Sequence, residues 1–512
     1  MNDHDSEFDR ELRDQVHPPD WRNPTPKGPY QLVVIGAGTA GLVAAAGAAG
    51  LGARVALIEN AFMGGDCLNF GCVPSKALIR SARVAATVRD ADRFGIHAAD
   101  WQTDFAGVMR RMRKLRAQIS PHDSATRFSK LGVDVFFGQG SFVDDESIHV
   151  HTDGGVNRDA TLTFRRAVIA TGARAAVPSI PGLNTIDYLT NETLFSLTEL
   201  PNRLGIIGAG PIGCEMSQTF SRLGCQVSLF DRNDRVLHRE DAAAAETLTE
   251  QLKRDGIQLC LGSRDLRVQS RGDETHVVSG CPGGQETVSV DRLLIASGRT
   301  PNIERLNLSS AGITSTKHGI NTNDFLQTTN PNVYAAGDVC SKLKFTHAAD
   351  FQARIVIQNA LFALGPFGRK KASQLLIPRV TYTSPEIAQV GITAKEAEAS
   401  GIGIQTFHQS LSEVDRAILD GECEGFVTIH VARKSDQILG ASVVAQNAGE
   451  MISEITLAMN TKVGLSKLAN NIHPYPTQSD AIRKLGDQCN RTKLTPLNKR
   501  LLSYLMRWNV GR

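Results

Sequence analysis

Residues 32–41 read LVVIGAGTAG, an apolar run followed by three glycines in the spacing GxGxxG. Leu32–Ile35 has the length of a buried parallel strand, and the small-residue segment after Gly41, LVAAAGAAGLG, is typical of a helix. A second apolar run, 55–58, follows and ends at Glu59. A strand, a glycine turn, a helix and a second strand together form the unit that binds a dinucleotide pyrophosphate at a helix N-terminus.

The same unit occurs a second time, over residues 204–231. In both copies an acidic residue, Glu59 or Asp231, lies 18 positions after the third glycine, where it takes ribose hydroxyls. A repeated unit with matched spacing indicates two nucleotide-binding domains in one chain. The glycines of the two turns are Gly36, Gly38 and Gly41, then Gly208, Gly210 and Gly213.

Composition places the chain among globular proteins, with 512 residues, 41% of them hydrophobic and 21% charged. The net charge of +3 is too small to indicate a nucleic-acid partner. No apolar run is long enough for a membrane span, and the N-terminus lacks the pattern of a secretory signal. Nine mostly scattered cysteines argue against a disulfide framework, so we expect a reducing, cytoplasmic location.

The most specific segment is 64–76, GGDCLNFGCVPSK, which contains Cys67 and Cys72. In a regular helix, Cα atoms five residues apart are separated by about 8.6 Å, whereas a disulfide needs them within about 7 Å. A bond therefore requires a distorted turn, which Gly71 makes feasible and which makes the disulfide easier to reduce. Lys76 shares the helical face of Cys72 and favours its thiolate. No second CxxC or CxxH motif lies nearby, so no metal site is predicted.

These motifs, with an α+β segment from about residue 372, resemble the pyridine nucleotide–disulfide oxidoreductases, which include dihydrolipoamide dehydrogenase, glutathione reductase and mercuric reductase. The resemblance implies an α/β fold with two doubly wound dinucleotide-binding domains, for FAD and NAD(P), and a C-terminal α+β dimerisation domain. The implied parts are a flexible N-terminal arm (1–28), an FAD domain in two segments (29–182 and 301–371) and an NAD(P) domain (183–300). A dimer-interface domain (372–490) and a basic amphipathic tail (491–512) follow.

The resemblance also implies roles for single residues. The first glycine turn would bind FAD and the second the nicotinamide dinucleotide. Cys72 would face the flavin, Cys67 would exchange with substrate, and Glu215 would pair with Lys76 near the reactive nitrogen of the flavin. Asp338 would bind the ribityl chain. The other implied cofactor positions are Gly65, Lys76, Thr171, Gly172, Gly298, Gly337 and Ala348.

The C-terminal motif HPYPTQSD, 473–480, departs from the family pattern. Dihydrolipoamide dehydrogenase and glutathione reductase carry a His-Pro here, with a Glu five residues beyond the acid/base His. Aligned on that motif, Tyr475 takes the base position and Asp480 the carboxylate position, while His473 could substitute only if the loop shifts. A tyrosine is a poor proton acceptor at pH 7, and mercuric reductase also has a tyrosine here.

Other features separate the chain from mercuric reductase. It shows no N-terminal CxxC domain and no vicinal cysteine pair near its end, where Cys489 is the last cysteine. Soft ligands for Hg(II) are therefore expected only at the Cys67–Cys72 pair, and efficient mercury reduction is not expected. Asp66 replaces the usual Thr or Ser and disfavours the neighbouring thiolate.

Two further patterns concern the nucleotide and the tail. Asp231 favours NAD(H) over NADP(H) because a carboxylate binds the ribose 2′-OH and repels a 2′-phosphate, although Arg232 could meet a phosphate. The segment 497–508 places apolar side chains on one helical face and basic ones opposite, as in a helix that packs on the dimer or contacts an anionic membrane weakly.

The sequence thus predicts a homodimeric FAD-dependent oxidoreductase. Electrons would pass from NAD(P)H through flavin to a redox-active disulfide, Cys67–Cys72, and on to a small-molecule acceptor: a disulfide, a quinone or a metal ion. Two alternatives stay open: a dihydrolipoamide dehydrogenase with an altered base, and a flavoprotein redox sensor docked on a membrane by its tail.

Overall fold

The computed structural model describes residues 6–152, 154, 157–271, 274–281 and 284–511. The chain forms two compact units, each assembled from three segments. Unit 1 comprises Met1–Gly208, Thr219–Phe230 and Arg264–Leu375, and unit 2 comprises Ala209–Gln218, Asp231–Ser263 and Leu376–Arg512.

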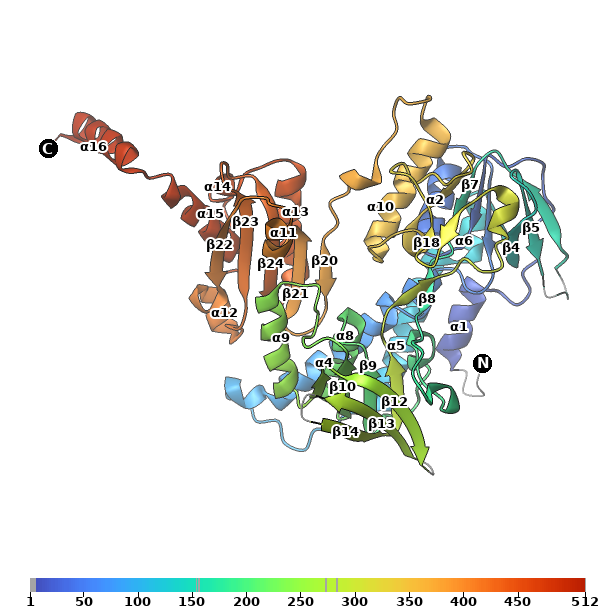
Figure 1. Ribbon diagram of the computed structural model, residues 1–512, viewed down its shortest axis with the longest axis horizontal. Coiled ribbons are helices and arrows are strands. Elements are labelled where there is room, and N and C mark those ends of the chain that lie inside the picture. The colour runs from blue at the N-terminus through green and yellow to red at the C-terminus, as the bar shows by residue number, and fades with distance from the viewer. Residues whose placement is uncertain (1–5, 153, 155–156, 272–273, 282–283, 512) are drawn as a thin grey trace. The chain divides into compact units, whose positions relative to one another are not determined.

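A five-stranded parallel sheet forms the centre of unit 1 (Figure 1). Along the first strand, Leu32 and Val34 pack into the core on one face, while Val33 and Ile35 pack into the core on the other. Burial on both faces explains why this strand is an unbroken apolar run. In spatial order the strands are β19 (Val333–Ala335), β7 (Ala167–Ile169), β1 (Leu32–Ile35), β2 (Val55–Glu59) and β3 (Val133–Phe137).

Helices cover one face of this sheet and a smaller antiparallel sheet covers the other. On the first face, α2 (Thr39–Gly50) and α10 (Thr346–Ile357) lie side by side (Figure 1), so close that a Cβ on Gly47 would lie 2.6 Å from Cδ1 of Ile357. The opposite core contains the inward side chains of β4 (Gln139–Phe142), β5 (Ser147–His151) and β6 (Ala160–Thr163).

At the N-terminus the structure differs from the expected flexible arm at 1–28. Residues 1–5 lie outside the described residues, but α1 (Glu7–Val16) follows directly. Leu12 and Val16 are buried in the same core as α2, and the Asp9 carboxylate lies 2.7 Å from the Arg116 guanidinium. Although this segment is polar overall, Leu12 and Val16 are four residues apart, so they lie on the same face of the helix and that face is buried.

The second glycine unit also forms the two predicted strands, β9 (Arg203–Ile207) and β10 (Gln226–Asp231), which pair in parallel. A further strand, β15 (Arg292–Ile295), which was not predicted, pairs in parallel with β9 on its other side. Helix α8 (Pro211–Arg222) begins inside the glycine turn. A three-stranded antiparallel sheet follows in the chain, with β12 (Arg264–Arg271), β13 (Glu274–Cys281) and β14 (Gly284–Val290).

Unit 2 contains a five-stranded antiparallel sheet, and α13 (Ala448–Asn460) and α15 (Asp480–Thr492) pack into one core with it. This arrangement is the α+β fold predicted for the C-terminal part of the chain. In spatial order the strands are β20 (Arg379–Thr381), β21 (Glu386–Gly391), β24 (Ile438–Ala445), β23 (Phe426–Ala432) and β22 (Ile404–Ser410).

The last helix, α16 (Pro496–Val510), differs from the other helices of unit 2. All of its residues are described, and none of them is buried. Within the part of the chain that the structure describes, no helix, this one included, is both long and apolar enough to cross a membrane.

Candidate functional site

Cys67 and Cys72 lie on two consecutive helices separated by a break. Cys67 is in α3 (Gly65–Asn69), and Cys72 is the first residue of α4 (Cys72–Arg89). Between them Gly71 has φ −132° and ψ −112°, and a Cβ on it would lie 2.8 Å from the Asp66 carbonyl oxygen. Both cysteines are free, and the Cys67 thiol donates a hydrogen bond to the Cys72 sulfur. The break is the distorted turn that the five-residue spacing predicts.

The two thiols differ in acidity. The hydrogen bond from Cys67, helped by the Thr346 hydroxyl 3.3 Å from Sγ and by the charge of Lys76, lowers the pKa of Cys72 to about 6 despite burial. Cys72 also stands at a helix N-terminus, where unpaired N–H groups stabilise a thiolate. Donation to Cys72, together with burial, raises the pKa of Cys67. Cys72 is therefore the thiolate of the pair and Cys67 the thiol.

Arg299 connects the cysteine segment with the later segments of unit 1. It is the first residue of β16 (Arg299–Pro301), and its guanidinium lies 3.2 Å from the Asp66 carboxylate and 3.6 Å from the Asp338 carboxylate. The Asn191 amide also donates to Asp66, at 2.6 Å. The charge of Asp66 raises the pKa of both cysteines, the direction predicted from the sequence, and the arginine beside it offsets part of that charge.

Asp338, the predicted ribityl ligand, lies in η5 (Gly337–Val339). Burial raises the pKa of its carboxyl, while the charges of Arg299 and Lys344 act in the opposite direction. The preceding Gly337 has a φ of +80° and donates its N–H to the Gln352 side chain of α10 at 2.8 Å. A partly buried carboxyl group beside Arg299 therefore lies in the segment that the resemblance assigns to FAD.

The first glycine turn has no room for side chains. A Cβ on Gly41 would lie 1.8 Å from the Gly36 oxygen, and a Cβ on Gly65 would lie 2.6 Å from Gly38 Cα. Gly38 caps α2 without a side-chain hydrogen bond. The first N–H groups of a helix lack intrahelical acceptors and suit a phosphate. The cradle and its donors therefore fit the pyrophosphate of FAD.

The acidic residue at the end of each second strand braces its own glycine turn. Glu59 accepts the Ala37 N–H at 2.7 Å, and Asp231 accepts the Ala209 N–H at 2.7 Å. Each carboxylate also accepts the N–H two residues further along the chain, at 2.8 Å. The sequence assigned both residues to ribose hydroxyls alone and missed this bracing, although the equal spacing in the two copies was a usable signal.

The remaining predicted cofactor positions lie where the chain crosses between domains or opens a helix. Thr171 donates its hydroxyl to the Asn302 carbonyl at 2.6 Å, and the Asn302 N–H donates to the Gly172 carbonyl at 3.0 Å. This pairing ties the two crossings together within unit 1. Gly298 and Gly208 have positive φ angles, +137° and +113°, and a Cβ on Gly208 would lie 2.5 Å from the Ala296 oxygen. Gly210 has open space around it, and Gly213 lies in α8. Ala348 is buried in the first turn of α10.

In unit 2, the predicted base Tyr475 is exposed, and its hydroxyl donates to the Asp415 carboxylate at 2.9 Å. This hydrogen bond raises the pKa of Tyr475, and the charge of Asp480 adds to the effect. Asp480 itself accepts from Arg483 at 2.7 Å. The structure thus brings Asp480 near Tyr475 but gives the direct hydrogen bond to Asp415, which sequence reasoning missed because Asp415 lies 60 residues away.

His473 and Glu215 are held by partners within unit 2. The His473 side chain is buried, and its Nε2 lies 3.0 Å from both oxygens of Glu454. Glu215 is buried and accepts the Tyr382 N–H at 2.8 Å. Lys76 belongs to unit 1, so its pairing with Glu215 stays a prediction.

The chain belongs to the pyridine nucleotide-disulphide oxidoreductases, whose members are FAD-dependent. The sequence model of this family matches residues 30–353, and the model of its dimerisation domain matches residues 377–485. The class predicted from the sequence and its α/β fold are therefore confirmed.

Two curated relatives and one solved structure show the range of the family. Mercuric reductase of Staphylococcus aureus is 35% identical over 457 residues, covering 89% of this chain and 82% of the relative. Dihydrolipoyl dehydrogenase of Bacillus subtilis is 32% identical over 465 residues, covering 88% and 96%. A Cu(II) complex of the HOCl-induced flavoprotein disulfide reductase of Escherichia coli is similar in structure, with TM-score 0.80, 29% identity, and coverage of 90% of this chain and 99% of that one.

We expect Cys72 to react with iodoacetamide, under reducing conditions, with a pH midpoint of about 6. The thiolate is the reactive form, so a lowered pKa keeps the rate high above that pH and lets it fall below. Thr346→Val removes one hydrogen bond to the sulfur and should raise the midpoint by roughly half to one pH unit. Thr346→Ser keeps a hydroxyl and should leave the pH midpoint unchanged.

Mass spectrometry of the peptide that carries Cys72 gives the rate at each pH. Two results would contradict the assignment: a wild-type midpoint near the ordinary cysteine value of about 8.5, or the same midpoint in the Val and Ser variants.

Proposed function

We propose that the protein is an NAD(P)H-dependent FAD oxidoreductase that uses Cys67 and Cys72 as a redox-active disulfide and passes electrons to a small-molecule acceptor. The observation that carries this proposal is the polarised thiol pair, in which Cys72 is acidified beside Thr346 and Lys76 while Cys67 stays protonated. FAD, when bound, supplies electron transfer between nicotinamide and disulfide. The first glycine turn and Asp338 would hold it.

The chain's own residues divide the work of thiol exchange. When the disulfide is reduced by two electrons, Cys72 keeps a thiolate and Cys67 takes up a proton. The Thr346 hydroxyl acts on both sulfurs, but only Cys72 also accepts the hydrogen bond from Cys67 and feels the charge of Lys76. Attack by Cys67 on an acceptor then requires loss of that proton. The Cys72 sulfur already accepts the hydrogen bond from Cys67 and is the nearest base for it.

The side chain at the base position bears on the identity of the electron acceptor. Tyr475, with its raised pKa and its hydrogen bond to Asp415, supplies a proton donor at neutral pH and no base. This favours a quinone or a metal ion over dihydrolipoamide or glutathione disulfide, whose exchange uses a histidine base in the family. The relatives named mercuric reductase and the Cu(II) complex of the Escherichia coli protein support the same preference.

We infer a homodimer from the dimerisation domain and a cytoplasmic location from the nine mostly scattered cysteines. In the resembled family the C-terminal base position comes from the partner subunit. By that analogy, Tyr475 of one chain would complete the site at Cys67 of the other.

For the nucleotide, we favour NADH over NADPH. Asp231 has the position of a ribose ligand at the end of β10, and a carboxylate there repels a 2′-phosphate. The exposed Arg232 next to it is the feature that opposes this choice.

A second function, docking on an anionic membrane surface, is favoured by α16. Eight large apolar side chains of this helix are exposed: Leu497, Leu501, Leu502, Tyr504, Leu505, Met506, Trp508 and Val510. Residues 491–512 contain six basic side chains and no acidic one. Leu497, Leu501, Tyr504, Leu505 and Trp508 share one face of the helix. An exposed apolar face with aromatic side chains and a positive charge matches an interfacial helix on acidic lipids.

The shared site can be tested by mixing two inactive chains. Cys67→Ser and Tyr475→Phe should each lower acceptor reduction, but in mixed dimers one site carries both changes and the other carries neither. Random pairing at 1:1 should then restore about a quarter of the wild-type rate. Failure to recover, with mixed dimers isolated by two affinity tags and Tyr475→Phe impaired alone, would show that the tyrosine serves its own subunit or none.

Asp231→Asn tests the nucleotide preference. The amide keeps an oxygen for the Ala209 N–H but removes the charge, so kcat/KM for NADPH should rise relative to NADH by about tenfold. Glu59→Gln is the matched control, because it makes the same change in the first turn and should alter FAD retention without altering nucleotide choice. Equal changes for both nucleotides in Asp231→Asn would refute this role.

Sedimentation with lipid vesicles tests the function of α16. The full chain should bind vesicles that contain phosphatidylserine, bind neutral vesicles poorly, and be released by high salt. A chain ending at residue 495 should not bind. Equal binding to both kinds of vesicle, or a change of oligomeric state on truncation without vesicle binding, would assign the helix to another partner.

A further inference from the structure

The strand β5 presents two histidines on the solvent face of its sheet. Side chains alternate along the strand, so Ile148 and Val150 enter the core of unit 1 while His149 and His151 point outward. The buried neighbours fix the strand, so the spacing of the two imidazoles is set by the fold. A cluster at this position is therefore held in place before any ligand arrives.

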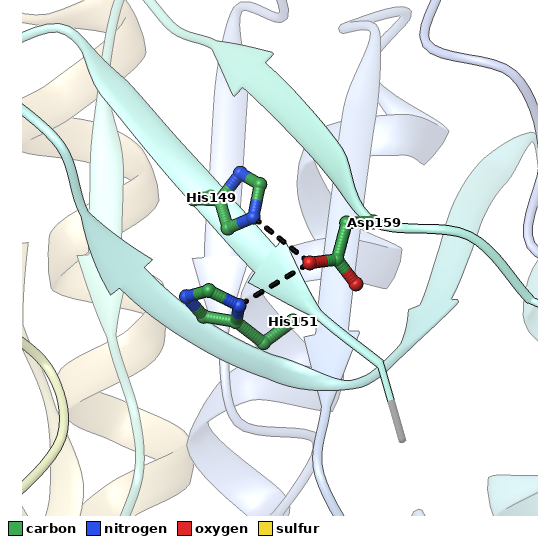
Figure 2. Close-up of side chains that lie close together, drawn as sticks. All are labelled: His149, His151 and Asp159. Atoms are coloured by element: carbon green, nitrogen blue, oxygen red, sulfur yellow. Dashed lines mark hydrogen bonds and ion pairs between the residues drawn. The ribbon is translucent and has the colours of Figure 1, made fainter. Parts of the chain in front are cut away.

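Asp159 completes the cluster from the neighbouring strand. It directly precedes β6, and the register that pairs His149 with Thr161 and Val150 with Ala160 places it opposite His151. Figure 2 shows one carboxylate oxygen between the two rings. That oxygen, Oδ2, lies 3.3 Å from Nε2 of His149 and 3.3 Å from Nδ1 of His151.

Two threonines orient these side chains from behind. Thr152 donates both its N–H and its hydroxyl to Oδ1 of Asp159, at 2.9 and 3.0 Å, which leaves Oδ2 facing the histidines. The hydroxyl of Thr161 lies 3.0 Å from Nδ1 of His149, the ring nitrogen that faces away from Asp159. Metal-binding histidines and carboxylates have outer partners of this kind, which fix the ring and the ligating atom.

The distances between the carboxylate oxygen of Asp159 and the two imidazole nitrogens match the spacing of ligand atoms around a metal ion. Nitrogen and oxygen ligands bind zinc at about 2.0–2.1 Å, so neighbouring ligand atoms in a tetrahedral site are about 3.3 Å apart. Both measured separations equal this edge, and the three ligand atoms all lie within 4.8 Å of one another. A simple surface ion pair joins one carboxylate to one histidine, whereas here a single oxygen of Asp159 lies beside both His149 and His151.

We propose that His149, His151 and Asp159 form a binding site for a divalent transition-metal ion of the zinc–copper class. Two imidazoles and one carboxylate are the donor set that such ions prefer, and the exposure of His151 leaves a coordination position for water. The site contains no cysteine, and its residues are not among those that form the thiol pair. The sequence-based prediction of no metal site considered only cysteine-centred motifs, and this proposal departs from it.

Binding would join β5 to the start of β6. Asp159 directly precedes β6, and the two histidines lie in β5. A metal ion bound to all three side chains would therefore link the two strands through three coordinate bonds. A ligand that binds only the folded arrangement stabilises it by mass action. The ion would therefore fasten the outer sheet of unit 1.

Calorimetry with Zn²⁺ tests the site. The full-length flavoprotein, freed of metals with EDTA, carries Cys67→Ser and Cys72→Ser in every sample so that thiols do not compete. The parent should bind one Zn²⁺ that His151→Gln and Asp159→Asn each weaken at least tenfold. His408→Gln is the matched control, since His408 is also an exposed strand histidine with Nδ1 3.0 Å from a threonine hydroxyl, that of Thr428.

Paramagnetic resonance with Cu²⁺ identifies the ligands directly. The parent should show hyperfine structure from two imidazole nitrogens, and His151→Gln should reduce it to one. Unchanged flavin absorbance and metal-free melting temperature show that the variants are folded. The proposal is overturned if Zn²⁺ affinity is the same in the parent, both site variants and the control, or if the Cu²⁺ spectrum does not respond to His151→Gln.

Discussion

The geometry around the cysteine pair depends on one close approach of backbone to backbone, between Gly38 and Gly65. Any side chain at Gly65 would collide with Gly38, so the first glycine turn and the helix that carries Cys67 meet with nothing between them. The Gly64 N–H donates to the Ala37 carbonyl at 2.8 Å and fixes the same junction. The turn continues a strand that is buried on both faces of the sheet. The contact between Gly38 and Gly65 therefore fixes the position of the cysteine-bearing helix relative to the sheet.

The asymmetry of the thiol pair arises from where each sulfur stands. The helix break places Cys72 at the start of α4, within reach of Thr346 at the start of α10, whereas Cys67 remains in the preceding short helix. Two helix N-termini therefore meet at one sulfur. The hydrogen bond from Cys67 to Cys72 is the largest source of the difference in acidity between the two thiols, and the helix break brings the sulfurs into position for it.

Local motifs were readable from the sequence, and contacts between distant segments were not. Each glycine turn and the cysteine spacing lie within a few dozen residues, so periodicity and spacing predicted the two nucleotide-binding units, and the family resemblance added the rest of the fold. The bond between Cys72 and Thr346 spans 274 residues and has no local signal. The partners of Asp66 were equally hidden. The alternating histidines of β5 were visible, but the placement of Asp159 beside them follows only from the hairpin register.

The guanidinium of Arg299, shared between Asp66 and Asp338, restricts the order in which this site can diverge. If Asp66 were exchanged first for the threonine or serine usual at its position, the arginine would keep one carboxylate. If Arg299 were lost first, two carboxylates would stand near two sulfurs with less opposing charge, and both thiols would become harder to ionise. Exchange of the aspartate before the arginine therefore disturbs the ionisation of the thiols less than the reverse order does.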